Sequence, residues 1–491
     1  MENGKCNGSS TTKCNGAAAA AMHVAMLVTP GMGHLIPLAE LAKRLAARHG
    51  VTSTLLTFAS TASATQREFL ASLPPAIESV SLPPVDLSDL PADAAIETLM
   101  SEECVRLVPA LTAILSGIRE RRRLVAFVAD LFGADSFDAA RDAGVPRRYL
   151  FFPTNLHALT LLLHLPDLDV SMPRRVPRPG ASPSGSPAAC PSRGRTSSCR
   201  SRTSPGRATG GWCTTARASR DADAILVNSF DAVEPDAARV LRHPKPGVPP
   251  VFPIGPLIQT HCAGDDDAAA PPSPRAACLD WLDRQPDRSV IFVSFGSGGA
   301  LPTEHMRELA LGLELSGQRF LWVVRSPSDE GEVSANYYGA ETKKNPFGYL
   351  PEGFVERTKE VGLLVPSWAP QTKVLAHRAT GGFLTHCGWN SVLESLVHGV
   401  PMVAWPLFAE QRQNAVMLTE GAGAAIRVPE SKGKEKIAAV VREMMVGEGR
   451  GAAVRAKVAE LQKMATDGLR DGGAATSALD EVVDKWTGGE K

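Results

Sequence analysis

Short apolar runs alternate with longer stretches of mixed polarity along most of the 491-residue chain. In the first half, the apolar runs have the length of strands, and the stretches between them have the periodicity of helices. We predict helices at Ile36–His49 and Ser136–Ala143 and strands at His23–Thr29, Val51–Phe58, Leu124–Ala129, Tyr149–Phe152 and Ala224–Asn228, the last strand of this half. Such alternation is typical of a parallel sheet covered by helices.

The second half repeats the alternation after a proline-rich stretch. Residues 243–276 combine many prolines with the acidic run Asp265–Asp267, which predicts a linker with a loop. We then predict helices at Pro302–Ser316, from Asn390 and at about Ala475–Trp486, and strands at Val290–Ser294, Phe320–Val324, Gly362–Val365, Gly382–Thr385 and Val400–Ala404. Two doubly wound units facing each other would place a ligand between the carboxyl ends of their strands.

These patterns divide the chain into successive parts. We predict a disordered tail, a first domain, a linker, a second domain and a C-terminal helix that packs back on the first domain, at residues 1–21, 22–242, 243–276, 277–470 and 471–491. Residues 172–220 do not fit the first domain, because Val170–Arg220 holds ten Arg but no Asp, Glu or Lys. One interpretation is a long basic loop. We favour an out-of-frame stretch of a GC-rich coding sequence, which yields Arg, Pro, Ser, Gly and Cys.

Composition narrows the class of protein. Hydrophobic residues make up 44% and charged residues 21% of the chain, as in soluble globular proteins. Lys+Arg and Asp+Glu are equal at 52 each, so there is no electrostatic reason to expect nucleic acid or an acidic membrane as partner. The nine cysteines form no CxxC pair, which favours reduced thiols in the cytoplasm over disulfides or zinc. Ala17–Val28 resembles a signal peptide only weakly, and no run is long enough for an integral membrane helix.

Polar and aromatic residues gather at predicted strand ends in the second half. Trp368 offers a flat face on which a base could stack. The turn Thr385–Ser391 leads from a strand into a helix, where Gly388 permits close backbone approach and free N–H groups favour phosphate. Glu394 follows one turn later and could accept hydrogen bonds from a ribose, and Glu410 and Gln411 end another strand. Each residue alone could be structural, but together they match the needs of a nucleotide sugar.

A candidate acid–base pair lies in the first half. His34 follows the first strand at the start of a helix, whose N-terminus we expect to lower the pKa of the imidazole and keep it neutral. Asp130 ends another strand at the same sheet edge, where its carboxylate could orient the ring. From the residues alone, a structural histidine and a helix-capping aspartate remain alternatives. His157 and Cys387 are poor candidates for catalysis.

Residues Trp368–Gln411 closely resemble the 44-residue signature box of plant secondary-product glycosyltransferases. Flanking phrases resemble the hydroquinone and small-phenol glucosyltransferase branch of this family 1 group; they are Cys278–Trp281, Phe295–Ser297 and Val227–Ser229. The resemblance extends from His23 to about Trp486 and lapses over 172–220. It implies an α/β fold of two facing Rossmann-like domains, the GT-B type, with the active site in the interdomain cleft.

The same resemblance implies a reaction and a set of roles. It implies inverting glucose transfer from UDP-glucose, a co-substrate, to a small phenolic acceptor by a monomer that uses no metal or cofactor. His34 would be the base and Asp130 its partner. The residues expected to bind the donor are Trp368, Ala369 and Gln371 for the nucleoside, Glu394 for the ribose, Ser297, His386, Asn390 and Ser391 for the diphosphate, Trp389, Glu410 and Gln411 for the sugar, and Thr154 for sugar or phosphate. The final Gln of the box is associated with glucose rather than galactose.

Two rival functions remain to be weighed. A nicotinamide-dependent oxidoreductase would fit Gly31-x-Gly33, but Ile36 replaces the third glycine, and no Asp or Glu lies between Glu40 and Glu68. A non-catalytic UDP-sugar-binding protein would follow if the 172–220 segment disrupts the acceptor side while the donor residues stay intact. Donor binding without product formation would identify that second case.

Overall fold

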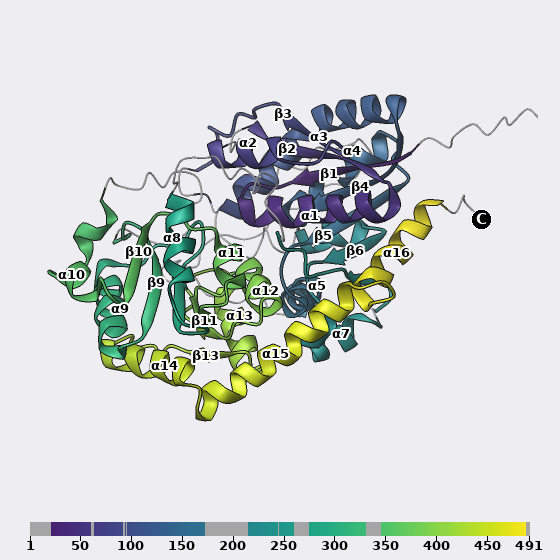
Figure 1. Cartoon of the computed structure of the whole chain (residues 1–491). Coiled ribbons are helices and arrows are strands. Elements are labelled where there is room, and N and C mark those ends of the chain that lie inside the picture. The colour runs from purple at the N-terminus through teal and green to yellow at the C-terminus, as the bar shows by residue number, and fades with distance from the viewer. Residues whose placement is uncertain are drawn as a thin grey trace, which may run out of the picture.

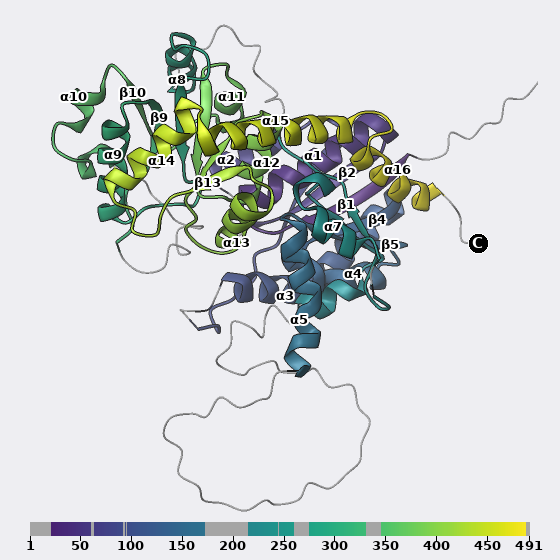
Figure 2. The ribbon, with the colours of Figure 1, turned by 90° about the horizontal axis from the view of Figure 1, so that it is seen from below.

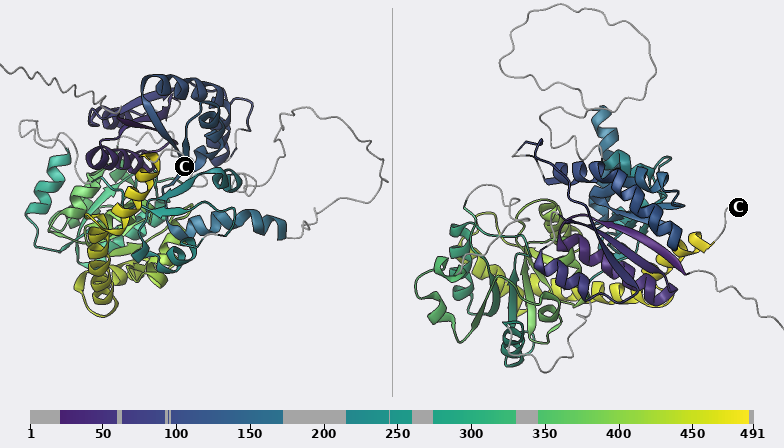
Figure 3. Two further views of the ribbon diagram at one scale, coloured as in Figure 1. Left: turned by 90° about the vertical axis from the view of Figure 1, so that its right-hand side faces the viewer. Right: turned by 90° about the horizontal axis from the view of Figure 1, so that it is seen from above.

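The computed structural model describes residues 21–59, 63–91, 94, 96–171, 215–243, 245–259, 274–329 and 345–487 (Figure 1). Within these residues the chain forms two sheets, and every pairing between neighbouring strands is parallel. The two sheets and their covering helices form two facing lobes (Figure 3). The α/β fold of two facing Rossmann-like domains predicted from the alternating pattern is therefore confirmed.

The first sheet has the strand order β3-β2-β1-β4-β5-β6-β7. Its strands are β1 (Met22–Val28), β2 (Thr52–Phe58), β3 (Ile77–Leu82), β4 (Arg123–Asp130), β5 (Arg147–Phe152), β6 (Ala224–Val227) and β7 (Val251–Pro253). Its helices are α1 (Met32–His49), α2 (Ala64–Ala71), α3 (Ile96–Arg121), α4 (Phe137–Asp142), α5 (Leu156–Ser171), α7 (Pro235–Leu241) and α16 (Ala474–Thr487). Strands β1, β2, β4, β5 and β6 are mostly buried, because helices cover both faces of the sheet, whereas the edge strands β3 and β7 are partly exposed.

The second sheet has the order β10-β9-β8-β11-β12-β13. Its strands are β8 (Val290–Ser294), β9 (Arg319–Val324), β10 (Gly362–Pro366), β11 (Thr380–Thr385), β12 (Met402–Ala404) and β13 (Ala425–Arg427). Its helices are α8 (Pro274–Asp283), α9 (Thr303–Ser316), α10 (Phe354–Thr358), α11 (Gln371–Ala376), α12 (Trp389–Val397), α13 (Gln411–Val416), α14 (Lys434–Val446) and α15 (Gly449–Leu469). One continuous apolar cluster fills this lobe.

The strand orders locate a place for a ligand. In each sheet the direction of winding reverses once, between β1 and β4 in the first sheet and between β8 and β11 in the second. In open parallel sheets, ligands bind outside the carboxyl ends of the strands at this switch point. The segments at the four strand ends hold His34, Asp130, Ser297 and His386, so the topology brings the predicted site residues to the two switch points.

The last helix packs against the first sheet, although the second sheet precedes it in sequence. The long helix α15 runs from α14 toward the first lobe, where α16 follows it (Figure 2). Leu479, Val482 and Trp486 of α16 are buried in the same cluster as β1 and α1, and Trp486 Nε1 donates to the Tyr149 hydroxyl at 3.0 Å. Burying one large apolar side chain of this kind contributes roughly 1.5–3 kcal/mol. The chain therefore crosses between the lobes twice.

The predicted linker contains a strand of the first sheet. Within residues 243–276, β7 (Val251–Pro253) pairs with β6, and Phe252, Ile254 and Leu257 are buried. The sequence pattern suggested that Ala224–Asn228 is the last strand of this half. That prediction is wrong, because β7 follows it in the same sheet. The prolines misled that prediction because β7 lies at a sheet edge, where proline is tolerated. The domain boundaries themselves stay a prediction.

Two further differences concern the first lobe. Helix α1 begins at Met32, four residues before the predicted start, although the Gly31–His34 stretch resembles a turn and Pro37 lies inside the helix. Most of the anomalous segment 172–220 lies outside the described residues, but its last part does not. Residues 215–218 are helical, and Thr215, Ala216 and Ser219 are buried. Within the described residues, the chain therefore already packs against the lobe at Thr215, before Arg220, where the composition recovers.

Candidate active site

The predicted catalytic pair meets at the switch point of the first sheet. His34 Nδ1 lies 2.7 Å from Asp130 Oδ2, although the two residues are 96 positions apart in sequence. Asp130 is fully buried, whereas the His34 side chain keeps 20% of its surface exposed. If Nδ1–H donates to the carboxylate, Nε2 is the ring nitrogen left to accept a proton. Within the described residues, no partner occupies Nε2.

The carboxylate of Asp130 is held by groups at both strand ends. Thr29, which follows β1, donates its hydroxyl to Oδ2 and its backbone N–H to the same oxygen at 3.3 Å. The other oxygen, Oδ1, accepts from Leu131 N at 2.7 Å, so Asp130 also caps the short 3-10 helix that follows β4. The capping role weighed as an alternative is therefore present together with the contact to His34. Thr29 was not predicted, and its position directly after a buried strand was the available signal.

The pKa of His34 is raised, not lowered as its place at a helix N-terminus suggested. Burial lowers the pKa of His34. The charge of Asp130, its hydrogen bond and the charge of Glu410 together raise the pKa by more than burial lowers it, so the net shift is upward. The two carboxylates outweigh the cost of burying the charged ring, and Asp130 acts most strongly because it lies within hydrogen-bond distance. Glu410 belongs to the second lobe, so the electrostatics of this site already involve both sides of the cleft.

Helix α13 begins at Gln411 after β12, and Glu410 is the residue directly before it. Burial raises the pKa of Glu410, and the nearby charge of His34 lowers it in part. Gln411 is buried, and its Oε1 accepts from Leu407 N at 3.0 Å and Phe408 N at 3.1 Å. This fixes the turn and leaves the amide nitrogen of Gln411 as its remaining polar group.

A second polar cluster forms at the ends of β10 and β11. Gln371 Nε2 donates to Glu394 Oε2 at 2.7 Å and to Ser391 Oγ at 2.8 Å. Glu394 is buried, and burial raises its pKa to about 7 despite the opposing effect of the Gln371 bond. Trp368 lies beside this cluster in sequence and keeps 48% of its surface exposed, whereas Ala369 is buried.

His386 lies between two glycines. A Cβ on Gly296 would come within 2.7 Å of the ring, and one on Gly388 within 2.4 Å of Nε2, so both positions must be glycine for the ring to fit. The glycine at 388 thus makes room for a side chain as well as for close backbone approach. Burial lowers the pKa of His386 to about 4, so the ring is neutral at pH 7, and its Nδ1 has no hydrogen-bond partner among the residues that the structure describes.

The first turn of α12 reaches across the cleft twice. Trp389 is only 3% exposed, and its indole N–H donates to Asn228 O at 2.6 Å. Asn390 Nδ2 donates to Gly33 O at 2.8 Å. The indole of Trp389 is therefore part of the contact between the lobes.

Three asparagines that were not predicted from the sequence also belong to this contact between the lobes. Asn155, which caps α5, donates through Nδ2 to Asn414 Oδ1, and Asn414 Nδ2 donates to Cys387 O at 2.9 Å. Asn228 is also held, because its Oδ1 accepts from Leu257 N at 2.7 Å. All three asparagines are buried. The signal for Asn228 was its position directly after a buried strand, and that for Asn155 was its place in the short turn after β5, while Asn414 inside a helix gave none.

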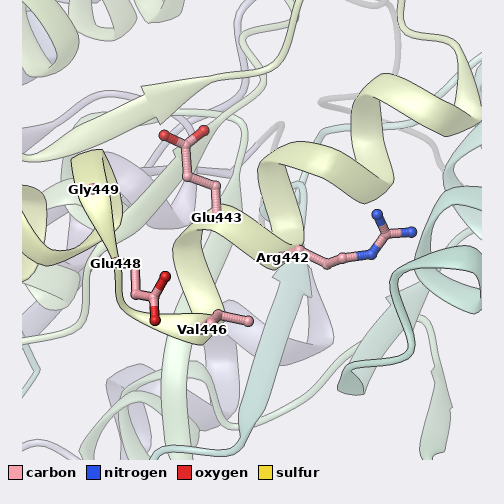
Figure 4. Close-up of a pocket in the computed structure, with 5 residues that line it drawn as sticks. All are labelled: Arg442, Glu443, Val446, Glu448 and Gly449. Atoms are coloured by element: carbon pink, nitrogen blue, oxygen red, sulfur yellow. The ribbon is translucent and has the colours of Figure 1, made fainter.

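The remaining predicted residues lie at the rim. Ser297 is exposed in the turn after β8, and Thr154 is half-buried after β5, where it accepts a long bond of 3.5 Å from Asn155 Nδ2. A pocket lies at the junction of α14 and α15, lined by residues of the second lobe (Figure 4). Its charged groups serve local structure, since Arg442 donates to Leu315 O and Glu443 pairs with Arg450.

Two absences hold for the described part of the chain. No group of three or more His, Cys, Asp or Glu side chains there could hold a metal ion. Among the helices that the structure describes, none has the length and apolar character to cross a membrane.

Two facing Rossmann-like domains, with the His34–Asp130 pair at the first switch point and His386 at the second, have the architecture of a GT-B glycosyltransferase. The sequence profile of the family "UDP-glucoronosyl and UDP-glucosyl transferase" matches residues 239–450. The chain is 46% identical to UDP-glycosyltransferase 72B3 of Arabidopsis thaliana, covering 94% of this chain and 95% of that protein. The chain belongs to the plant family 1 UDP-glycosyltransferases and is an enzyme of that class.

Two further comparisons refine the relationship. Hydroquinone glucosyltransferase of Rauvolfia serpentina is 45% identical, with 94% of this chain and 97% of that protein covered. The structure of Phytolacca americana UGT2 complexed with UDP-2fluoro-glucose and pterostilbene is 39% identical, with a TM-score of 0.78 over 95% of this chain and 100% of that one. The resemblance inferred from Trp368–Gln411 and its flanking phrases is therefore confirmed.

Proposed function

We propose that this enzyme transfers glucose from UDP-glucose to a hydroxyl group of a small phenol, with inversion at the anomeric carbon. The observation that carries the proposal is the 2.7 Å contact between His34 and buried Asp130, facing Glu410 of the opposite lobe. Hydroquinone glucosyltransferase supports the phenolic acceptor, and the complex with UDP-2fluoro-glucose supports the donor. We further propose that it works as a monomer in the cytoplasm, without metal or cofactor, where the buried thiols Cys104, Cys278 and Cys387 stay reduced.

The transfer is a single displacement. The acceptor hydroxyl loses its proton to His34 Nε2 while its oxygen forms a bond to the anomeric carbon of glucose. The bond from that carbon to the diphosphate breaks, and its electron pair leaves with UDP. Asp130 holds the ring in the tautomer that leaves Nε2 free and stabilises the imidazolium that forms. Because Asp130 is fully buried and accepts bonds from Thr29 and Leu131, it keeps its position during the proton transfer.

The donor is bound by the second lobe, with the residues in the following roles. Trp368 stacks on uracil, Ala369 and Gln371 hold the nucleoside, and Glu394 accepts from the ribose hydroxyls. Gly388 opens the backbone at the N-terminus of α12, which stabilises the negative charge that grows on the leaving diphosphate. The other diphosphate ligands are Ser297, His386, Asn390 and Ser391, and the sugar ligands are Trp389, Glu410, Gln411 and Thr154.

A direct test measures binding and turnover on the same preparation. The purified full chain is titrated with UDP-glucose by calorimetry and then incubated with hydroquinone and a panel of other small phenols. We expect saturable binding and formation of a β-glucoside, whose configuration proton NMR assigns from the anomeric coupling. An α-glucoside would contradict the single displacement. Binding with no product from any phenol would favour the non-catalytic function instead.

A further inference from the structure

The first turn of α1 is tied to the opposite lobe through a backbone carbonyl. Asn390 Nδ2, from the first turn of α12, lies 2.8 Å from Gly33 O. Gly33 directly precedes His34, so this bond holds the peptide unit next to the proposed base. Asn390 is itself a proposed diphosphate ligand. The contact therefore joins the segment that carries the base to the helix that receives the leaving group.

Pro37 explains why the Gly33 carbonyl is available. In an α-helix the carbonyl of residue 33 accepts a hydrogen bond from the N–H of residue 37. Pro37 lies inside α1 and has no N–H, so this bond cannot form. A proline at an interior position is normally unfavourable, partly because it leaves a carbonyl without its helical donor. Here the donor comes from Asn390 across the cleft.

The amide of Asn390 can serve both lobes at once. A side-chain amide nitrogen carries two N–H donors, and the bond to Gly33 uses one of them. Asn390 stands in the first turn of α12, where helix N–H groups are free and favour an anion. The second N–H is therefore available to a phosphate oxygen while the first holds Gly33.

We propose that Pro37 is a positioning residue for glucosyl transfer. By keeping the Gly33 carbonyl free of the helix, it lets Asn390 fix the first turn of α1, and with it His34, relative to the bound diphosphate. This inference rests on the proposed role of His34 as the base. A residue with an N–H at position 37 would compete with Asn390 for the Gly33 carbonyl. His34 would then no longer be held at a fixed position relative to the donor.

The test is the substitution Pro37→Ala, assayed with saturating UDP-glucose and hydroquinone. We expect kcat to fall roughly 2- to 10-fold, the range spanned by the net contribution of one hydrogen bond. The Kd for UDP-glucose is expected to stay within about twofold, because the donor residues of the second lobe are untouched. The melting temperature should not fall, because alanine favours a helix interior over proline. Unchanged kcat in Pro37→Ala would overturn the proposal.

A matched control and a second background separate positioning from a general effect on the fold. Pro109 lies inside α3 and is exposed, so Pro109→Ala also adds an N–H to a helix interior and is expected to leave kcat unchanged. In an Asn390→Ala background the bond is already lost, so adding Pro37→Ala should cause no further loss of kcat. An equal loss in both backgrounds would refute the coupling. If His34→Ala kept full activity, the proposed function would fail instead, which is a separate outcome.

Discussion

The two sides of the cleft assemble their chemistry in different ways. The donor side takes most of its proposed residues from one continuous stretch, Trp368–Gln411, at the ends of β10, β11 and β12. The catalytic side takes His34 and Asp130 from strand ends that are 96 residues apart in sequence. Donor binding is thus distributed over many contacts, whereas activation of the acceptor is concentrated in one pair. Losses on the donor side should be graded and appear in affinity, and a loss on the catalytic side should be steep and appear in turnover.

The largest effect is expected for His34→Ala. Removing the base should lower kcat roughly 10²- to 10⁴-fold, the usual contribution of a positioned general base. The Kd for UDP-glucose should change by no more than about twofold, since the second lobe carries most of the proposed donor ligands. Steady-state assays and calorimetry measure the two quantities.

The same helix offers a matched control for this variant. His49 stands at the other end of α1, with Nε2 3.1 Å from Asp480 Oδ1, and His49→Ala is expected to keep kcat. Equal losses in the two variants would show that damage to α1, and not loss of the base, explains the effect.

A smaller effect, on the affinity for the donor and not on kcat, is expected for Trp368→Ala. Stacking on a base contributes roughly 1–3 kcal/mol, so the Kd for UDP should rise roughly 5- to 150-fold. At saturating donor, kcat should stay close to that of the native chain. Trp368→Phe, which keeps a ring, should recover part of the affinity. A fall in kcat without a change in Kd would contradict the assignment of Trp368 to donor binding.

The smallest effect concerns pH and Glu394. Burial holds the pKa of this carboxyl at about 7, and a ribose hydroxyl donating to it favours the charged form. Binding therefore lowers the pKa, so affinity is complete above pH 7 and declines by up to about tenfold per unit below it. Calorimetric titration with UDP-glucose at several pH values between about 5.5 and about 8 measures this dependence of the affinity on pH. Glu394→Gln should bind more weakly and without this pH dependence, and a parallel slope in that variant would exclude Glu394 as the titrating group.

What could be predicted from sequence follows the same division. The proposed donor residues could be named from sequence because one motif holds them in a fixed order, and their roles stay a prediction. The alternating pattern was enough to predict two parallel sheets. The raised pKa of His34 was not predictable, because it depends on Asp130 and Glu410, which only the folded chain brings near. The bonds from Trp389 to Asn228 and from Asn155 to Asn414 were missed for the same reason. Strand β7 was missed because its prolines suggested a linker, and an edge position overrides that signal.

The return of α16 to the first sheet has a consequence for how the protein is made. Leu479, Val482 and Trp486 cover the face of the sheet that β1 and α1 help to form. During vectorial synthesis on the ribosome, that face stays uncovered until the whole second lobe has been translated. Domains usually fold in the order in which they emerge, but here the first lobe cannot complete its core until after the second. The nascent chain therefore carries an exposed apolar surface for most of its synthesis, and it should depend on holding chaperones more than its two-lobed architecture alone would suggest.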